Sequence, residues 1–160
     1  MLNLLFGKEE LMVTISHYLD PKMIIFLNGK SRDDVIKSLV DTLVKERKVD
    51  HNESLFDAII EREKIVTTGI GMGVAIPHAK LQEYDDFFIA VGILDKGVDW
   101  DALDNNPVRL VFLIGGPDDK QTEYLQILSS LTLALKDEER RKKILNAKSP
   151  EEVVKLFEGF

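Results

Sequence analysis

The residues with the clearest chemical potential lie in one glycine-rich stretch, residues 67–80. Three glycines fall within residues 69–73, and Pro77 stands directly before His78. Glycines allow close approaches that side chains forbid, and the exposed amides of such a loop can receive an oxyanion. Proline fixes its own φ and favours an extended residue before it. We therefore expect a short strand at residues 74–76, with His78 at the end of a stiff segment.

An imidazole in this setting points to phosphoryl chemistry. Neutral histidine is a nucleophile towards phosphorus, and its pKa lies near neutrality. Phosphoryl transfer needs positioning and positive charge near the equatorial oxygens. Arg62 and Lys64, upstream, and Lys80, downstream, are candidates to supply that charge. These residues allow a phosphohistidine at His78, although a histidine after a proline can also be structural or simply exposed.

Other motifs fail on spacing. Residues 29–31 read Gly-Lys-Ser like the end of a P-loop, but Ile24 occupies the place of its first glycine. The glycines of residues 69–73 do not fit the dinucleotide pattern G-x-G-x-x-G, and a helix rather than a strand is expected before them. Zinc is disfavoured because the histidines lie far apart in unrelated contexts. They are His17, His51 and His78.

The amino-acid composition excludes or disfavours several classes of function. The chain has 160 residues, and 28 Asp and Glu against 21 Lys and Arg give a net charge of -7, which disfavours nucleic acid as a partner. The absence of cysteine excludes disulfides, thiol catalysis and cysteine-based zinc sites. No apolar run approaches the ~20 residues that cross a bilayer, so no direct membrane insertion is expected. The residue usage fits a cytoplasmic protein.

Hydrophobic periodicity predicts the elements that position the stretch. Apolar runs predict strands, with turns at 95–97 and 104–107, and 3.6-residue periodicity predicts helices. The strands are residues 23–27, 87–94 and 108–114; the helices are residues 31–47, 53–64, 121–135, 138–146 and a last one after Ser149. Ser31 and Ser149 are expected N-caps. This order predicts an α/β fold, a mixed sheet with helices on both faces.

One domain accounts for most of the chain. We expect a single domain over residues 12–160, preceded by an N-terminal extension, residues 1–11. The extension has a short apolar patch that Lys8 and two glutamates follow at once, so it does not fit a signal peptide. It is expected to dock on the body or to fray, with a peripheral membrane or partner contact as the alternative.

Residues 62–63 and 67–78 resemble the active-site signature of the fructose/mannitol class of enzyme IIA of the bacterial phosphotransferase system, which includes the nitrogen-regulatory type. That signature is an R-E pair followed by S/T-T-G-I-G-x-G-[IV]-A-[IV]-P-H. The flanking segments resemble the family too, so the likeness covers nearly the whole chain from about Met12 onward.

The resemblance implies a three-layer α/β/α fold with one strand, two helices, three strands and three helices. It implies that His78 becomes a tele-phosphohistidine, accepting phosphate from HPr and passing it to a IIB component. Arg62 would steady the phosphoryl group. The remaining pocket residues would be Thr68, Gly69, Gly71 and Gly73. No metal or organic cofactor is expected, because HPr delivers the phosphoryl group.

The sequence departs from the family at Tyr124. Many members carry a second active-site histidine there, in an H-L-x-x-L pattern, and a tyrosine cannot be cationic. Tyr124 is either a phosphate ligand or a packing residue. Two other readings stay open: a signalling protein of the nitrogen-regulatory type, and a non-catalytic interaction module with the same fold.

Overall fold

The computed structural model describes residues 13–50 and 53–160, so the expected extension 1–11 lies outside the described residues. Two short 3-10 helices, η1 (Ile15–Tyr18) and η2 (Pro21–Met23), open the described chain. The strands are β1 (Ile24–Leu27), β2 (Gly69–Gly71), β3 (Val74–Ala75), β4 (His78–Lys80), β5 (Phe88–Val98) and β6 (Val108–Gly116). The α-helices are α2 (Arg32–Lys45), α3 (Glu53–Ile65), α4 (Gln121–Leu135), α5 (Glu138–Leu145) and α6 (Pro150–Lys155).

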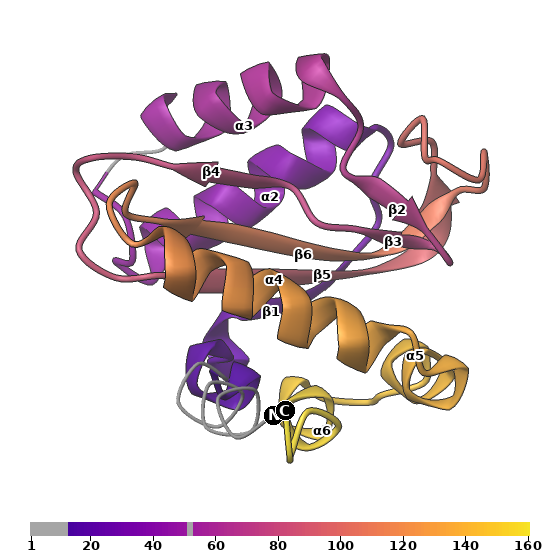
Figure 1. Ribbon diagram of the computed structural model, residues 1–160. Helices are drawn as coiled ribbons and strands as arrows, with labels where there is room; N and C mark the ends of the chain where they lie inside the picture. Colours follow the sequence, from indigo (N-terminus) through magenta and orange to yellow (C-terminus); the bar gives the residue numbers. More distant parts are fainter. Residues whose placement is uncertain (1–12, 51–52) are drawn as a thin grey trace, which may run out of the picture.

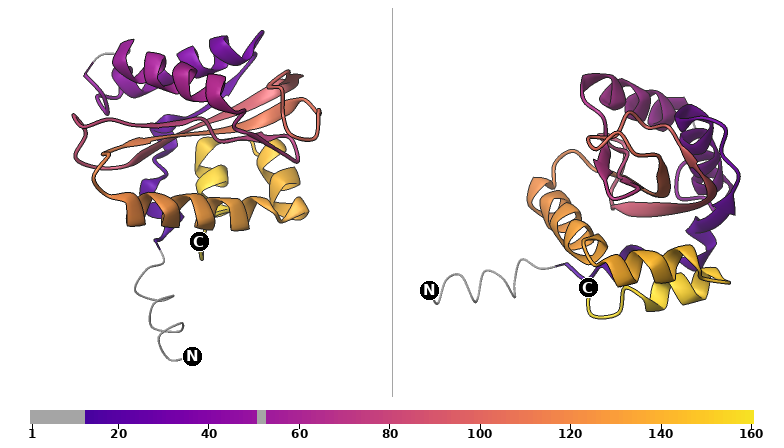
Figure 2. Two further views of the ribbon diagram at one scale, coloured as in Figure 1. Left: turned by 45° about the horizontal axis from the view of Figure 1, so that its top comes forward. Right: turned by 90° about the vertical axis from the view of Figure 1, so that its right-hand side faces the viewer.

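The strands form one mixed, six-stranded sheet. Its order is β1-β5-β6-β3-β2, and β4 also pairs with β6. Strands β3 and β4 run parallel to β6, whereas β5 is antiparallel to it. Helices α2 and α3 cover one face and α4 lies on the other (Figure 1). The turned views in Figure 2 keep these two helical groups on opposite sides of the sheet, so the expected α/β fold is confirmed.

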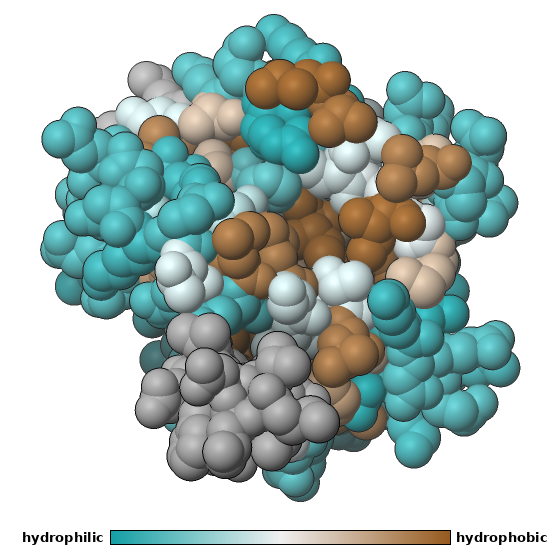
Figure 3. Space-filling model, in the orientation of Figure 1, coloured by the Kyte–Doolittle hydropathy of each residue, from teal (hydrophilic) through white to brown (hydrophobic). Residues whose placement is uncertain are grey.

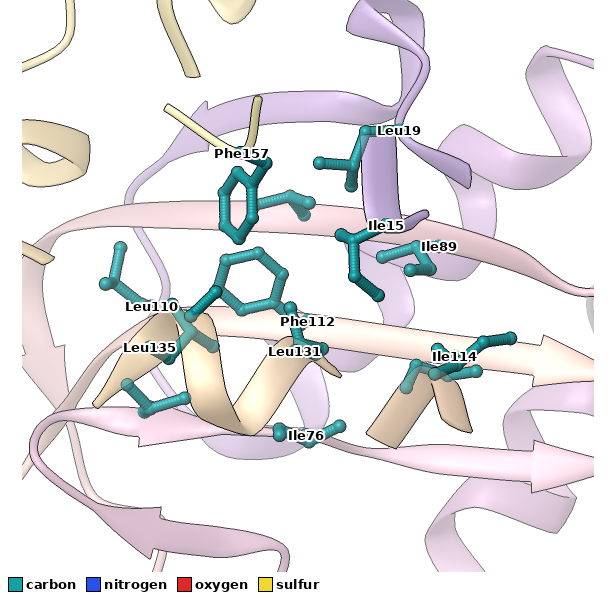
Figure 4. Packing of buried hydrophobic residues seen from close by; sticks show 14 of the residues in the cluster. Ile15, Leu19, Ile76, Ile89, Leu110, Phe112, Ile114, Leu131, Leu135 and Phe157 are labelled. Carbon is teal, nitrogen blue, oxygen red and sulfur yellow. The ribbon is translucent and has the colours of Figure 1, made fainter. Parts of the chain in front are cut away.

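Alternation along β5 and β6 divides the core into two clusters. Neighbouring residues of a strand point to opposite faces. Ile89 and Phe112 therefore pack towards α4, α5 and α6, whereas Ala90 and Val111 pack towards α2 and α3. Figure 4 shows the first cluster, in which the rings of Phe112 and Phe157 meet edge to face at 5.8 Å between centroids.

Helix starts follow the expected cap chemistry. The Ser31 side chain accepts a hydrogen bond from the backbone N–H of Asp34, and the Ser149 side chain does the same for Glu152. Pro150 occupies the first turn of α6, where its missing N–H costs nothing. These caps satisfy donors that the first helical turn would otherwise leave unpaired.

Two expectations about strands are wrong. The chain forms five strands between α3 and α4 rather than three, because the glycine-rich stretch contributes β2 and β4 in addition to β3, the short strand expected at residues 74–76. The predicted turn at residues 95–97 lies inside β5, which continues to Val98 with a register irregularity. Gly97 is explained by packing, since a Cβ there would lie 2.5 Å from the Cβ of Pro107.

Within the part of the chain that the structure describes, no helix is long and apolar enough to cross a membrane.

Candidate functional site

His78 begins β4 and is held by backbone pairing on β6. It stands opposite Ile114 in the parallel ladder, and the carbonyl of Pro77 accepts the N–H of Ile114 at 2.9 Å. Pro77 is buried, whereas the side chain of His78 is only partly buried. The sheet therefore fixes the backbone of His78 while leaving its ring accessible.

The hydrogen bond at one ring nitrogen sets the tautomer of His78. Nδ1 lies 2.8 Å from the carbonyl oxygen of Ile76. A carbonyl oxygen only accepts, so Nδ1 carries the proton. In a neutral ring Nε2 is then unprotonated and holds the nucleophilic lone pair. Nε2 is the tele nitrogen, which the family resemblance predicts as the site of phosphorylation.

The surroundings keep the His78 imidazole uncharged. Burial lowers its pKa below the ordinary value of 6.5, and the positive charges of Arg62 and Lys80 lower it further. The hydrogen bond to Ile76 and the negative charge of Glu63 oppose the shift but do not cancel it. A lowered pKa leaves the ring neutral at physiological pH, which is the nucleophilic form.

Arg62 lies in the last turn of α3, at the end nearest the site. Its Nη1 donates to the carbonyl of Val66 at 2.7 Å, which ties the guanidinium to the segment between α3 and β2. Its charge lowers the pKa of both His78 and Tyr124. Lys64, in contrast, pairs with Glu61 at 2.8 Å on the exposed helix surface. Of the two upstream cations, Arg62 is the one placed to act on the imidazole.

Tyr124 and Lys80 lie on the α4 side of the site. The Tyr124 ring lies 5.7 Å from the His78 ring, centroid to centroid, and the Lys80 Nζ lies 4.4 Å from the Tyr124 centroid. Lys80 also donates to the side-chain oxygen of Gln121. Burial raises the pKa of Tyr124 to about 12, so its hydroxyl is neutral. The structure therefore places Tyr124 against His78 and Lys80 against Tyr124, and the positive charge of Arg62 acts on both rings.

Thr68 belongs to a buried hydrogen-bonded cluster with Glu63 and Trp100, which we call the brace. Its N–H donates to Glu63 Oε2 at 3.1 Å, and its hydroxyl donates to the same carboxylate. The Trp100 Nε1 donates to Glu63 at 3.3 Å and to Thr68 Oγ1 at 3.2 Å. The Thr68 carbonyl accepts the N–H of Ile76, the residue whose own carbonyl orients His78. The structure thus gives Thr68 hydrogen-bond partners that tie α3 to the histidine segment.

Strands β2 and β3 form an antiparallel hairpin, and its glycines Gly71 and Gly73 lie away from the imidazole. The Gly73 carbonyl accepts the N–H of Leu110 at 3.0 Å, whereas His78 pairs with Ile114 on the same strand. Four residues of β6 separate these positions, roughly 13 Å at about 3.3 Å per residue. Gly71 and Gly73 have φ of 99° and 75°, and Met72 between them has 61°. Gly71 and Gly73 are therefore needed for the turn, and the geometry does not bring them to the pocket.

Gly69 has a packing role of its own. A Cβ at this position would lie 2.9 Å from the Cα of Ala102, and the Gly69 N–H donates to Thr67 Oγ1 at 3.0 Å.

Sequence reasoning missed Trp100 as a partner of the site. The available signal was that Trp100 is the single tryptophan of the chain, standing between Asp99 and Asp101. Among the described residues, no group of histidine, cysteine or acidic side chains could hold a metal ion.

Known proteins of the phosphotransferase system are similar to this chain. A fructose-specific EIIA component of the phosphotransferase system from Haloferax volcanii is 37% identical over 123 residues, 77% of this chain and 80% of that protein. A fructose-specific EIIABC component from Bacillus subtilis is 36% identical over 131 residues, 82% of this chain but 21% of that protein.

The fold has close matches among solved structures. The nitrogen regulatory protein IIA-Ntr from Neisseria meningitidis superposes with a TM-score of 0.84 at 27% identity, covering 91% of this chain and 99% of the other. The model of the family described as "Phosphoenolpyruvate-dependent sugar phosphotransferase system, EIIA 2" matches residues 17–159. The chain therefore belongs to this EIIA family.

Proposed function

We propose that this protein is a phosphoryl carrier of the phosphotransferase system, which accepts phosphate from HPr on His78 and passes it to a IIB component in the cytoplasm. The observation that carries the proposal is the hydrogen bond from Nδ1 to the Ile76 carbonyl at 2.8 Å. It leaves Nε2 as the nucleophile, in a ring whose pKa is lowered by burial and by the positive charges of Arg62 and Lys80. Such an arrangement suits attack on phosphorus.

The transfer is a substitution at phosphorus. The lone pair of His78 Nε2 forms the new P–N bond, and the bond from phosphorus to HPr breaks with its electron pair staying on HPr. The Nδ1 proton stays in its hydrogen bond to Ile76, so the carbonyl offsets positive charge that develops on the ring. Release reverses these roles, since the acceptor atom of IIB attacks and the P–N electron pair returns to Nε2. Arg62 stabilises the equatorial oxygens in both directions.

Apolar side chains beside the site provide contact area for both partners. Val66, whose carbonyl holds Arg62, and Leu125, the neighbour of Tyr124, are each 51% exposed. Apolar surface gathers on the face shown in Figure 3, which is the face that β4 and α4 share in Figure 1. Exposed apolar area of this kind marks interaction sites. The name EIIABC of the Bacillus subtilis relative supports a IIB component as the acceptor.

Incubation with radiolabelled phospho-HPr tests the proposal. We expect acid-labile, base-stable label on the wild type and no label on His78→Ala. His17→Ala is the matched control, because His17 is exposed on η1, and it should be labelled like the wild type. A folded wild-type protein that takes no label would leave only the interaction-module reading. NMR of the labelled protein then distinguishes phosphorus on Nε2 from phosphorus on Nδ1.

A second candidate, a signalling protein of the nitrogen-regulatory type, is favoured by Tyr124 and by the likeness to IIA-Ntr. Without a second histidine, the phosphorylated form would persist longer and report the state of the system. Adding a IIB component to labelled protein separates the two roles. Rapid loss of label supports the carrier, whereas label that persists while HPr still loads the protein supports signalling.

A further inference from the structure

We propose that Lys80 supplies the second positive charge at the phosphoryl site and that the ring of Tyr124 holds its ammonium group in place. This role rests on the proposed phosphorylation of His78 and adds a residue to that site. It also gives Tyr124 a function other than that of a phosphate ligand.

The strand places Lys80 on the same side as His78. The two residues are two positions apart on β4, and side chains at such positions share one face of a strand. Ala79 between them is buried, whereas His78 and Lys80 are both partly exposed. The two side chains therefore leave the same face of β4, from Cα atoms about 6–7 Å apart along the strand.

Two contacts from α4 restrict the Lys80 side chain. Its Nζ lies 4.4 Å from the Tyr124 ring centroid, within the range of a cation–π interaction, and it donates to the side-chain oxygen of Gln121. The Tyr124 ring is fixed in turn, because it is buried and stacks on Phe87 at 6.1 Å between centroids. A lysine held in this way keeps its charge at one position instead of sampling many rotamers.

The positive charge of Lys80 acts electrostatically on the His78 imidazole. Lys80 and Arg62 both lower the pKa of His78, while Glu63 raises it, and Tyr124 faces the ring as a neutral group. A field that disfavours a proton on the imidazole favours the negative oxygens of a phosphoryl group at the same place. Arg62 comes from α3 and Lys80 from β4, so the two cations approach from different elements.

Rapid-quench measurement of transfer from radiolabelled phospho-HPr tests this role. Lys80→Met should slow labelling about tenfold, less than the roughly 10²–10³ typical of a buried oxyanion donor, because Lys80 is partly exposed. The final extent of labelling should stay high, since His78 is intact. Lys80→Arg should restore most of the rate. Lys120→Met is the matched control with the same change in net charge, because Lys120 is exposed and donates to the carbonyl of Asp85.

The role of the ring is tested separately. Tyr124→Phe keeps the aromatic face and removes the hydroxyl, so its transfer rate should stay near that of the wild type. Tyr124→Leu removes the face and should slow transfer as Lys80→Met does. If transfer is slow in Tyr124→Phe, the hydroxyl itself binds phosphate. That result would overturn the proposal that the Tyr124 ring acts by holding Lys80.

An NMR titration of His78 gives a readout that a purely structural lysine would not move. Lys80→Met should raise the pKa of the imidazole, and Lys120→Met should leave it unchanged. Equal labelling rates for these two variants, with the wild type labelled, would refute the role of Lys80 while leaving the carrier function intact. An unlabelled wild type would defeat the carrier function and, with it, the role of Lys80 in transfer, so this result is distinct from a labelled wild type with equal rates for the two variants.

Discussion

The substitution Glu63→Gln tests whether the buried brace determines the stability of the site. Glu63 is 4% exposed, and its carboxylate accepts hydrogen bonds from the Thr68 N–H, the Thr68 hydroxyl and the Trp100 indole. Glutamine has nearly the same shape but replaces one acceptor oxygen by a donor NH2 group. The variant thus changes the hydrogen bonding without leaving a cavity.

The magnitude follows from the partners. In its best orientation the amide oxygen accepts from the Thr68 N–H, and the NH2 group faces the hydroxyl of Thr68 and the Trp100 indole. The hydroxyl can turn to accept, and the indole keeps its bond to Thr68 Oγ1 at 3.2 Å. The indole bond to position 63 is lost and the two bonds to Thr68 become neutral, so we expect a loss of about 2 kcal/mol in the free energy of unfolding.

Urea unfolding followed by tryptophan fluorescence and circular dichroism measures this loss, and Trp100 is the only tryptophan. Glu61→Gln is the control, because Glu61 forms an exposed pair with Lys64 and should change stability by at most about 0.5 kcal/mol. The His78 pKa should also fall, since Glu63 raises it. A Glu63→Gln variant as stable as Glu61→Gln would refute the reasoning.

Three further outcomes are expected. Gly116→Ala should cost about 1–3 kcal/mol in chemical denaturation, because its Cβ would lie 2.1 Å from Cδ1 of Phe87. Arg62→Ala should slow transfer from phospho-HPr about 10²-fold while unfolding data change by about 1 kcal/mol, the value of its bond to Val66. The folded pKa of His78 lies below 6.5, so its contribution to stability is complete above about pH 6.5 and is lost as the pH falls through the folded pKa. Subtracting the stability profile of His78→Gln from that of the wild type should isolate this pH dependence; a difference that does not change with pH would contradict it.

Local patterns were enough to predict the helices. The 3.6-residue period of the apolar side chains and the side-chain caps at Ser31 and Ser149 are properties of adjacent residues, and the structure has both. The strand at residues 108–114 was also predictable, because β6 is buried on both faces and is apolar except for Arg109. Pro77 before His78 indicated a stiff, extended approach, and the structure places His78 at the start of β4.

The roles of the glycines could not be read from the sequence. A turn with positive φ, a close approach to another segment and an anion-binding loop all favour glycine, and they differ only in what lies nearby in space. Gly71 and Gly73 serve the turn, Gly69 approaches Ala102, and Gly97 approaches Pro107. The brace of Glu63, Thr68 and Trp100 joins residues up to 37 positions apart, which no local period encodes.

Strand β4 carries both His78 and Lys80, and a series of aromatic contacts holds the side chain of Lys80 in place. Lys80 stands opposite Gly116 on β6, and the missing side chain of Gly116 is what lets the Phe87 ring lie against the strand. Phe87 stacks on Tyr124, and Tyr124 carries the ammonium of Lys80 on its face. A side chain at position 116 would push Phe87 towards Tyr124 and displace the cation. The glycine at the end of β6 is therefore a requirement of the site as well as of the fold.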